Sequence, residues 1–348
     1  MKKKFRVFIP EPEWEKSLAA LEEIAEVKTG VPNLIYTESQ LVKEIKNIDA
    51  LIITSQHHVT RKVIEAAKKL KVIVKYGSKP GIDTVDLEAA TEKGIPVCYT
   101  PEANSDSVAE HTIALILALL KRINVTSFQL REGKWRDKNL LGYELLGKKV
   151  GIIGLGKIGY KVAERIRGFQ AKLLAYDPYV SENRAKQVKV KLTDLETLLR
   201  ESDIVTIHAA LNEETVHLIG EQELGLLKKS AFMVNTARGA IIDEKALIKA
   251  LERGWIAGAA LDVFEEEPPK SDNPLLEMSN IIVTPHSASC TYEAYQREAF
   301  MAVEEVLRVL NGNKPRFVAN PEKFLERKNI KPKKNKLISA RIPRYRKC

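Results

Sequence analysis

Short apolar runs alternate with longer amphipathic stretches along most of the chain. The runs are rich in β-branched residues, as buried strands are, and the stretches between them repeat hydrophobic residues at helical spacing. Strands that alternate with helices indicate a parallel sheet with helices on its faces. We therefore predict an α/β fold with two doubly wound parallel-sheet domains. The predicted strands are 5–10, 50–54, 71–75, 95–99, 149–153, 173–176, 203–208, 231–235, 257–261 and 281–284.

The helical spacing predicts a helix in most of the intervals between these strands. The helix at 108–120 is more apolar than a surface helix, so we expect it to be buried between domains or subunits. Ser107 and Glu110 have the spacing of a capping box, which would start this helix at residue 108. The other predicted helices are 12–26, 61–69, 86–93, 157–169, 194–200, 221–228, 243–253 and 292–310.

Residues 149–177 combine a strand, a glycine-rich turn, a helix, a second strand and an acid, in the order that a dinucleotide site needs. Gly154 would permit the tight turn, Gly156 the approach of a pyrophosphate, and Gly159 close packing of the helix on the strand. The helix N-terminus would attract the phosphates. Asp177 would bind both ribose hydroxyls and repel a 2′-phosphate, so we predict NAD and consider NADP the less favoured cofactor.

The bulk composition is that of a globular protein with room for two domains: 348 residues, 44% of them hydrophobic and 29% charged. The longest uninterrupted apolar run, 113–120, is far shorter than the roughly 20 residues that cross a bilayer. The N-terminus lacks the features of a signal peptide. Three widely spaced cysteines indicate neither a disulfide framework nor a zinc site. We expect a cytoplasmic protein with no membrane segment and no metal.

The formal net charge of +10 comes from one end of the chain. Ten of the 56 Lys and Arg residues lie after residue 326, where there is no acid, which leaves 46 basic against 46 acidic residues in 1–326. We interpret 327–348 as a basic, flexible, solvated tail. A weaker hypothesis is that the tail binds a nucleic acid, an anionic membrane or an acidic partner.

Three predicted strands in the second half of the chain are followed by groups suited to oxidising a 2-hydroxy acid. Arg238 offers a bidentate fork for a substrate carboxylate. His286 can remove the hydroxyl proton or return it, and Glu267 can orient its ring. Each alone could be an ordinary surface residue. Because the carboxyl ends of parallel strands meet at one edge of a sheet, we predict that the three form one site.

The first half of the chain has no glycine fingerprint, so we expect no nucleotide site there. The segments 54–58 and 76–83 follow predicted strands and are candidate substrate loops. We interpret His57 and His58 as ordinary exposed loop residues.

The chain resembles the D-isomer-specific 2-hydroxyacid dehydrogenases over roughly residues 5–320. This family includes D-3-phosphoglycerate dehydrogenase, glyoxylate and hydroxypyruvate reductases and D-lactate dehydrogenase. The motifs that carry the resemblance are DLEAATEKGIP at 86–96, VAEHT at 108–112, GKW at 133–135, GIIGLGKIG at 151–159, YDP at 176–178, NTARG at 235–239, EP at 267–268 and TPH at 284–286.

The resemblance implies a role for each matching residue. Arg238 would bind substrate, Glu267 and His286 would form the catalytic pair, and Asp177 would bind the adenosine ribose. It also implies that Asp262 lies near the nicotinamide amide. The remaining cofactor contacts that it implies, beyond the three glycines, come from Thr112, Lys157, Ile158, Ala209, Thr236 and His286.

The resemblance further implies a NAD-binding Rossmann domain at 105–286, inserted in a smaller flavodoxin-like substrate domain made of 1–104 and 287–326. Homodimers would form through the NAD-binding domains. The expected substrate contacts are Ser78, Lys79 and Gly81, together with Arg238.

Two features depart from the family pattern. The segment 77–83 is about two residues longer than in relatives and contains Lys79. We hypothesise that Lys79 binds a second anionic group of the substrate; a lysine that only faces solvent is the alternative. Ala210 stands where relatives usually have proline, which would slightly loosen a cofactor loop.

The predicted function is an NAD-dependent oxidoreductase that transfers a hydride between a small D-2-hydroxy acid and nicotinamide. One alternative is a D-3-phosphoglycerate dehydrogenase of serine biosynthesis, although the residues after 326 leave no room for the regulatory domains of its long forms. A non-catalytic, NAD-sensing scaffold of the co-repressor type is the alternative from another class. The intact Arg238, Glu267 and His286 favour the enzyme.

Overall fold

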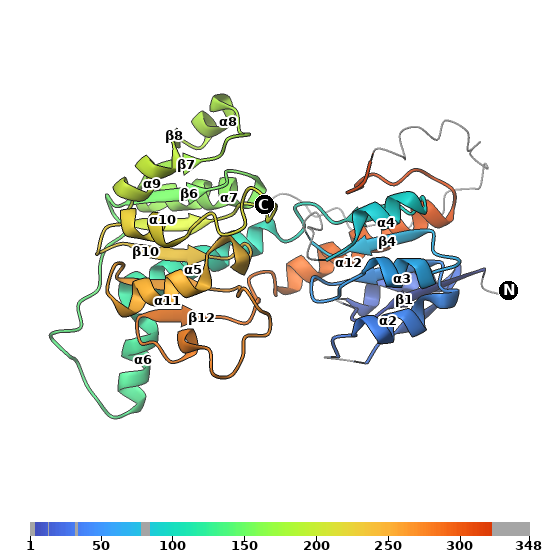
Figure 1. Cartoon of the computed structure of the whole chain (residues 1–348), viewed down its shortest axis with the longest axis horizontal. Coiled ribbons are helices and arrows are strands. Elements are labelled where there is room, and N and C mark those ends of the chain that lie inside the picture. The colour runs from blue at the N-terminus through green and yellow to red at the C-terminus, as the bar shows by residue number, and fades with distance from the viewer. Residues whose placement is uncertain (1–3, 13, 32–33, 78–83, 322–348) are drawn as a thin grey trace. The chain divides into compact units, whose positions relative to one another are not determined.

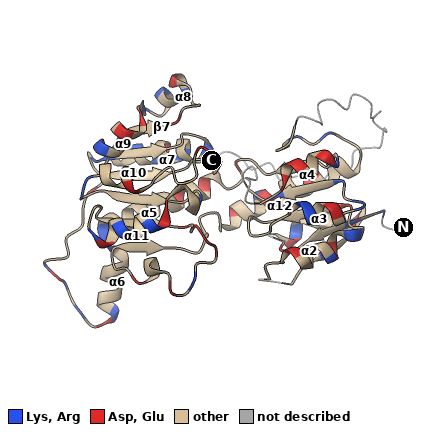
Figure 2. Ribbon diagram, viewed as in Figure 1, with Lys and Arg blue, Asp and Glu red and all other residues tan. Residues whose placement is uncertain are grey.

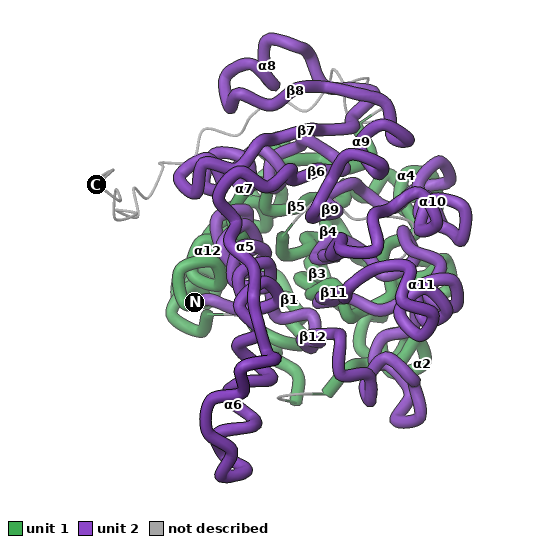
Figure 3. Tube along the Cα trace, turned by 90° about the vertical axis from the view of Figure 1, so that its left-hand side faces the viewer, with its two compact units in different colours: residues 1–104, 292–348 green, residues 105–291 purple. Residues whose placement is uncertain are grey.

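The chain divides into two compact units, which Figure 3 shows in different colours. The computed structural model describes residues 4–12, 14–31, 34–77 and 84–321. The first unit combines residues 1–104 with 292–348, and the second is the continuous segment 105–291. The second boundary, predicted after residue 286, coincides in the structure with the start of helix α12 at Tyr292.

The second unit is built on a sheet of seven parallel strands in the order β12-β11-β10-β9-β6-β7-β8 (Figure 1). β6 has β9 on one side and β7 on the other, so the strand order reverses beside β6. The strands are β6 (Lys149–Ile153), β7 (Lys172–Tyr176), β8 (Lys191–Leu192), β9 (Ile204–Ile207), β10 (Phe232–Asn235), β11 (Gly258–Leu261) and β12 (Ile281–Val283).

Helices cover both faces of this sheet, because two clusters of buried apolar side chains lie on opposite sides of it. One cluster contains residues of α9, α10 and α11, and the other contains residues of α5, α7 and α8. The helices are α5 (Ser105–Lys121), α6 (Ile123–Arg131), α7 (Lys157–Ile166), α8 (Glu182–Gln187), α9 (Leu195–Glu201), α10 (Glu221–Leu226) and α11 (Glu244–Glu252), with short 3-10 turns η3 (Arg167–Phe169), η4 (Gly239–Ile241) and η5 (Pro274–Leu276).

The first unit has a sheet of five parallel strands in the order β2-β1-β3-β4-β5. Helix α12 (Tyr292–Leu310) returns to this sheet and packs against β4, so both ends of the chain build one unit. The other elements are β1 (Phe5–Ile9), η1 (Glu15–Ser17), α1 (Ala19–Glu22), β2 (Ala25–Thr29), α2 (Glu38–Glu44), η2 (Ile45–Asn47), β3 (Ala50–Ile53), α3 (Arg61–Ala66), β4 (Val72–Lys75), α4 (Leu87–Glu92) and β5 (Val97–Tyr99).

The predicted fold class is confirmed, with two parallel α/β sheets, but two local predictions are wrong. The helix expected at 12–26 is a short turn, the four-residue α1 and then strand β2. β2 lies at the edge of the sheet and pairs only with β1, so several of its polar side chains face solvent. The resulting mixture of polar and apolar residues resembles the pattern of an amphipathic helix.

The second wrong prediction is the capping box at Ser107. Helix α5 begins two residues earlier, at Ser105, and the Ser107 hydroxyl donates to the carbonyl oxygen of Ala288 instead of capping the helix. Helix α5 is largely buried, as expected from its composition, but the elements that it packs on are α7, β10 and β11 of its own unit, whereas we expected burial between domains or subunits.

Helix α6 extends away from the body of the second unit in Figures 1 and 3, and none of its residues is buried. Basic and acidic residues are interspersed over the helices of both units (Figure 2). Among the described residues, the only stretch that meets the length and hydrophobicity of a membrane span is α5 taken together with α6, and these two helices meet at a bend of 62°. The basic tail at 327–348 lies outside the described residues.

Candidate active site

The glycine turn follows β6 directly and leads into α7. Gly154 has φ +88°, a conformation that side-chain-bearing residues rarely adopt, and a Cβ there would lie 2.7 Å from the backbone nitrogen of Ala209. A Cβ at Gly159 would collide with the carbonyl oxygen of Gly154, so only glycine lets α7 pack so closely on the turn. Gly156 is the N-cap of α7, and the space beside its Cα is open.

This geometry fits a dinucleotide. The open space at Gly156 lies at the N-terminus of a ten-residue helix, where backbone N–H groups and the helix dipole favour phosphate. Asp177 follows β7 and accepts hydrogen bonds from the backbone nitrogens of Leu155 at 2.8 Å and Tyr179 at 2.9 Å. Its carboxylate is therefore held beside the turn, in the place where a ribose hydroxyl needs an acceptor.

Sequence reasoning missed Arg184, a cation beside the same turn. Its guanidinium, on α8, lies 4.7 Å from the centroid of the Tyr160 ring, and its Nη2 lies 3.4 Å from the carbonyl oxygen of Gly156. No sequence motif identified it, because α8 reaches the turn only through the fold of the sheet.

His286 and Glu267 form a hydrogen-bonded pair after β12 and β11, at the same carboxyl-terminal edge of the sheet as the glycine turn. Nδ1 of His286 lies 2.6 Å from Oε2 of Glu267, and the two side chains are 24% and 33% exposed. His286 follows β12 and has φ +52°, an uncommon backbone conformation for a residue other than glycine. The backbone of this turn is held by a hydrogen bond from the His286 nitrogen to the carbonyl oxygen of Asp262 at 2.7 Å.

The surroundings of Glu267 keep it ionised. Burial is the largest influence and by itself raises its pKa, but the hydrogen bond and charge of His286, a hydrogen bond from the backbone nitrogen of Phe264 and the charge of Arg238 together lower the pKa below its usual value. The charge of Arg238 is the smallest of these influences on the pKa of Glu267. Arg238 follows β10, and its Nη1 donates to the carbonyl oxygen of Ala237 at 2.7 Å.

Asp262 stabilises the turn that contains His286 by hydrogen bonds. It is 1% exposed, and its two carboxylate oxygens accept hydrogen bonds from the Thr284 hydroxyl and from the backbone nitrogens of Ser287 and Ala288 at 2.5–2.9 Å. His111, which the prediction omitted, adds a ring nitrogen 3.2 Å from the Thr284 hydroxyl. The signal was present in the VAEHT motif, since His111 precedes the expected contact Thr112.

The other predicted cofactor residues lie at the same edge of the sheet. Thr112, on α5, and Thr236, after β10, are buried and share a hydrogen bond of 2.9 Å between their hydroxyls. Lys157 and Ile158 are the first residues of α7, and Ala209 follows β9 against the glycine turn. The structure thus places all the predicted cofactor residues in the second unit.

The predicted substrate loop is only partly described. Ser78, Lys79 and Gly81 lie outside the described residues. Gly77, which is described, donates its backbone N–H to the Thr100 hydroxyl at 2.6 Å. The interpretation of His57 as an exposed loop residue is wrong: it is 0% exposed, its Nδ1 lies 2.9 Å from the Thr54 hydroxyl, and burial lowers its pKa to about 4.

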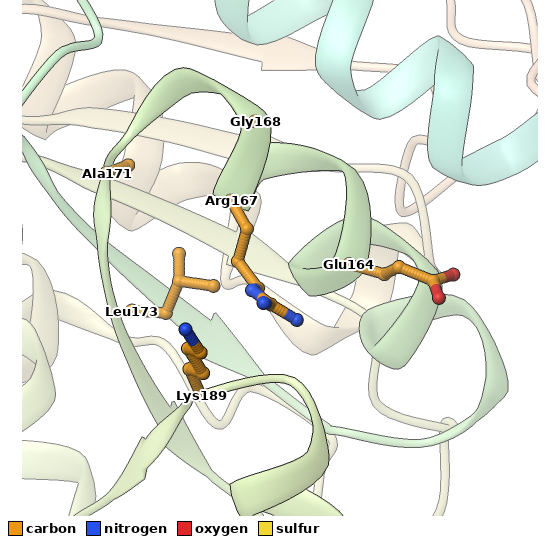
Figure 4. A pocket seen from close by; sticks show the side chains of 6 residues that line it. All are labelled: Glu164, Arg167, Gly168, Ala171, Leu173 and Lys189. Carbon is orange, nitrogen blue, oxygen red and sulfur yellow. The ribbon is translucent and has the colours of Figure 1, made fainter.

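A hollow of about 520 Å³ lies elsewhere on the second unit (Figure 4). It is at the beginning of β7, whereas Asp177 and the glycine turn are at the opposite ends of their strands. None of the predicted site residues lines it; the lining residues are Glu164, Arg167, Gly168, Ala171, Leu173 and Lys189.

Comparisons with known proteins agree with the motifs. Residues 113–288 match the model described as D-isomer specific 2-hydroxyacid dehydrogenase, NAD binding domain. The chain is 41% identical over 318 residues to a D-3-phosphoglycerate dehydrogenase of Archaeoglobus fulgidus, a match that covers 90% of this chain and 59% of that protein. It is 38% identical over 321 residues to a glyoxylate reductase of Korarchaeum cryptofilum, covering 91% of this chain and 96% of that protein.

A solved structure of D-lactate dehydrogenase from Aquifex aeolicus, in complex with NAD and lactic acid, is similar with a TM-score of 0.78 at 30% identity, covering 88% of this chain and 96% of that one. The chain spans about three fifths of the length of the archaeal phosphoglycerate dehydrogenase, 59%, and nearly the whole of the glyoxylate reductase. Residues 113–288 are an NAD-binding domain, and the chain belongs to the D-isomer specific 2-hydroxyacid dehydrogenase family.

Proposed function

We propose that this protein is an NAD-dependent oxidoreductase that converts a small D-2-hydroxy acid and its 2-keto acid into one another. The observation that carries the proposal is the His286–Glu267 pair, with the charge of Arg238 acting on it, at the sheet edge that also carries the glycine turn. A general acid–base group, a carboxylate-binding cation and a dinucleotide site in one unit are what this reaction requires.

His286 moves the proton of the reaction. Its Nδ1 is engaged by Glu267, so Nε2 is the nitrogen that accepts the substrate hydroxyl proton in oxidation and returns it in reduction. Glu267 stays ionised because its pKa is lowered, so it orients the ring and stabilises the positive charge that forms on it. Arg238 binds the substrate carboxylate through two parallel hydrogen bonds.

The chain holds the cofactor at its two ends. Gly156 and the N-terminus of α7 receive the pyrophosphate, and Asp177 receives the adenosine ribose. Thr112, Thr236 and Asp262 would hold the nicotinamide end. Bound NAD would supply the hydride acceptor for oxidation of the hydroxy acid, and bound NADH the hydride donor for reduction of the keto acid.

The decisive test is a panel of 2-keto acids that includes glyoxylate, hydroxypyruvate and phosphohydroxypyruvate, each measured with NADH and NADPH by the absorbance of the reduced nicotinamide. We expect turnover with at least one acid and a preference for NADH, because Asp177 repels a 2′-phosphate. A protein that binds NADH and reduces none of these acids would instead be the non-catalytic scaffold.

Phosphohydroxypyruvate is the specific second candidate substrate, because the archaeal relative that is 41% identical is a D-3-phosphoglycerate dehydrogenase. The hypothesis that Lys79 binds a second anionic group of the substrate belongs to the same test. If Lys79→Ala changes the KM of no accepted acid, Lys79 is a solvent-facing residue.

A homodimer in the cytoplasm completes the proposal. The segment from α6 onward exposes large apolar side chains that the described residues of its own unit leave uncovered: Ile123, Phe128, Leu130, Trp135, Leu141 and Leu146 are 53–82% exposed. A patch of this kind is typical of a subunit interface. Sedimentation should give twice the chain mass of 39.1 kDa.

A further inference from the structure

Two side chains from different strands meet across the end of β6. Tyr179 follows β7, Glu214 follows β9, and the Tyr179 hydroxyl donates to Oε2 of Glu214 at 2.5 Å. β7 and β9 are the two neighbours of β6 in the sheet. A bond between the segments that follow these neighbours therefore passes over the end of β6, which is where the glycine turn begins.

The Tyr179 end of this bond is joined to the nucleotide site through the backbone. The Tyr179 nitrogen donates to one oxygen of Asp177 at 2.9 Å, and the other oxygen of Asp177 accepts from the Leu155 nitrogen in the glycine turn. The position of the tyrosine is thus coupled to the carboxylate that would bind the adenosine ribose.

The Glu214 end is equally well held. The Glu214 nitrogen donates to the side-chain oxygen of Asn212 at 3.0 Å, and the Thr215 hydroxyl donates to the carbonyl oxygen of Ala210 at 2.7 Å. The same segment begins at Ala209, against which Gly154 packs. Both segments that carry the bond therefore touch the glycine turn, one through Asp177 and the other through Ala209.

The hydrogen bond between Tyr179 and Glu214 contributes little to the folding stability of the protein. Tyr179 is 78% exposed and Glu214 is exposed, and a hydrogen bond between exposed groups adds little to folding because water competes for both partners. The hydrogen bond to Glu214 raises the pKa of Tyr179, so the phenol stays protonated and remains a donor at neutral pH.

We propose that Tyr179 and Glu214 form a clasp over the adenosine half of the nucleotide site, and that this clasp slows the release of bound NAD and NADH. The inference deepens the proposed function, on which it rests for the identity of the ligand. It assigns to the clasp a role in retaining the cofactor and none in the proton or hydride transfer.

The test is the rate at which NADH leaves the protein, followed by the fluorescence of the reduced nicotinamide after mixing with excess NAD. We expect Tyr179→Phe and Glu214→Ala each to release NADH on the order of three- to tenfold faster and to weaken its equilibrium binding by a similar factor. The double variant should release it no faster than the single ones, since both remove the same bond.

Glu213→Ala is the matched control. Glu213 is also exposed and precedes Glu214 in the chain, so this variant removes the same charge without breaking the bond to Tyr179. It should leave NADH release unchanged. An unchanged release rate in Tyr179→Phe, or an equal acceleration in Glu213→Ala, would overturn the clasp. NADH release is measured without catalytic turnover. If the protein reduced no keto acid, the proposed function would be contradicted, but the release rates would still test the clasp.

Discussion

The second unit contains two histidine–glutamate pairs that look alike in isolation. His286 lies 2.6 Å from Glu267, and Nε2 of His217 lies 2.8 Å from Oε1 of Glu265. Both histidines have positive φ, +52° and +50°. Both glutamates come from the segment after β11. A short distance and an uncommon backbone conformation are therefore not enough to identify a catalytic pair.

The surroundings separate them. Glu267 takes part in an electrostatic network with Arg238 that lowers its pKa, and the turn of His286 rests on the buried Asp262. Glu265, by contrast, exchanges hydrogen bonds with Glu244 at the start of α11, so its pair joins two loops and a helix end. We interpret the first pair as catalytic and the second as a structural link. Three experiments test this difference, in order of decreasing effect, and a fourth concerns a buried histidine outside both pairs.

The largest effect is expected from replacing the histidines. His286→Ala should lower kcat by about 10³-fold or more, because general acid–base catalysis is lost, and should leave NADH binding nearly intact. His217→Ala should change kcat by less than about threefold, because the pair that it breaks is 37–44% exposed. Steady-state kinetics with NADH titration measures both; equal losses in the two variants would mean that the assignment of the pairs is wrong.

Arg238 is next, as the neighbour that distinguishes the catalytic pair. Arg238→Lys should lower kcat/KM roughly 10–100-fold, almost as much as Arg238→Ala, because an ammonium group cannot replace the bidentate fork. Arg61→Lys, in an exposed ion-pair cluster of the first unit, should have no such effect. Full retention of activity in Arg238→Lys would show that the guanidinium does not hold the carboxylate.

A smaller loss is expected from the glutamates. Glu267→Gln keeps the size of the side chain but removes the charge that stabilises protonated His286, so kcat should fall about tenfold, less than with loss of the histidine itself. Glu265→Gln should leave kcat unchanged and lower only the melting temperature. The comparison fails if the two glutamine variants have the same kcat.

The smallest effect concerns a third histidine, His57, which is buried in the first unit without a carboxylate in hydrogen-bond contact among the described residues. Burial lowers its pKa to about 4 from the ordinary 6.5. Between these values the unfolded chain binds more protons than the folded one, so stability falls as pH falls, by up to roughly 3 kcal/mol from this group.

Calorimetry should therefore show that the melting temperature falls less between pH 7 and pH 5 in His57→Gln than in the wild type. His208, in the second unit, has a pKa lowered to about 3 by burial and should keep part of the acid sensitivity in both proteins. An identical pH dependence in the two proteins would mean that His57 is not held neutral.

Much of the candidate site could be predicted from the sequence because it depends on short segments at strand ends. The glycine spacing at 154–159, the acid at Asp177 and the groups after three strands, Arg238, Glu267 and His286, are all local patterns. A parallel sheet brings the ends of its strands to one edge, so their convergence follows once the strands are recognised. The six strands predicted in the second unit were correct for the same reason, since each is a short apolar run between helices, whereas the two-residue strand β8 was not predicted.

The wrong predictions have a common cause. Burial of a residue and its contacts with residues far away in the sequence leave no signal in the neighbouring residues. Strand β2 looked helical because an edge strand has only one partner and exposes polar residues. His57 looked exposed because its loop is polar in sequence, whereas the sheet of the first unit buries it completely. Ser107 looked like a cap, but its partner is 181 residues away.

By itself, the sequence determined the fold class, the NAD turn and the residues that carry the proposed chemistry, because each depends on spacing along one segment. Only the tertiary structure showed that Glu267 contacts His286 while Glu265 and His217 form a second, similar pair, and it alone joined Tyr179 to Glu214 across the glycine turn. Those contacts depend on which strands are neighbours in the sheet, β12 and β11 for the catalytic pair and β9, β6 and β7 for Tyr179 and Glu214, and hydrophobic periodicity along the chain contains no information about that order.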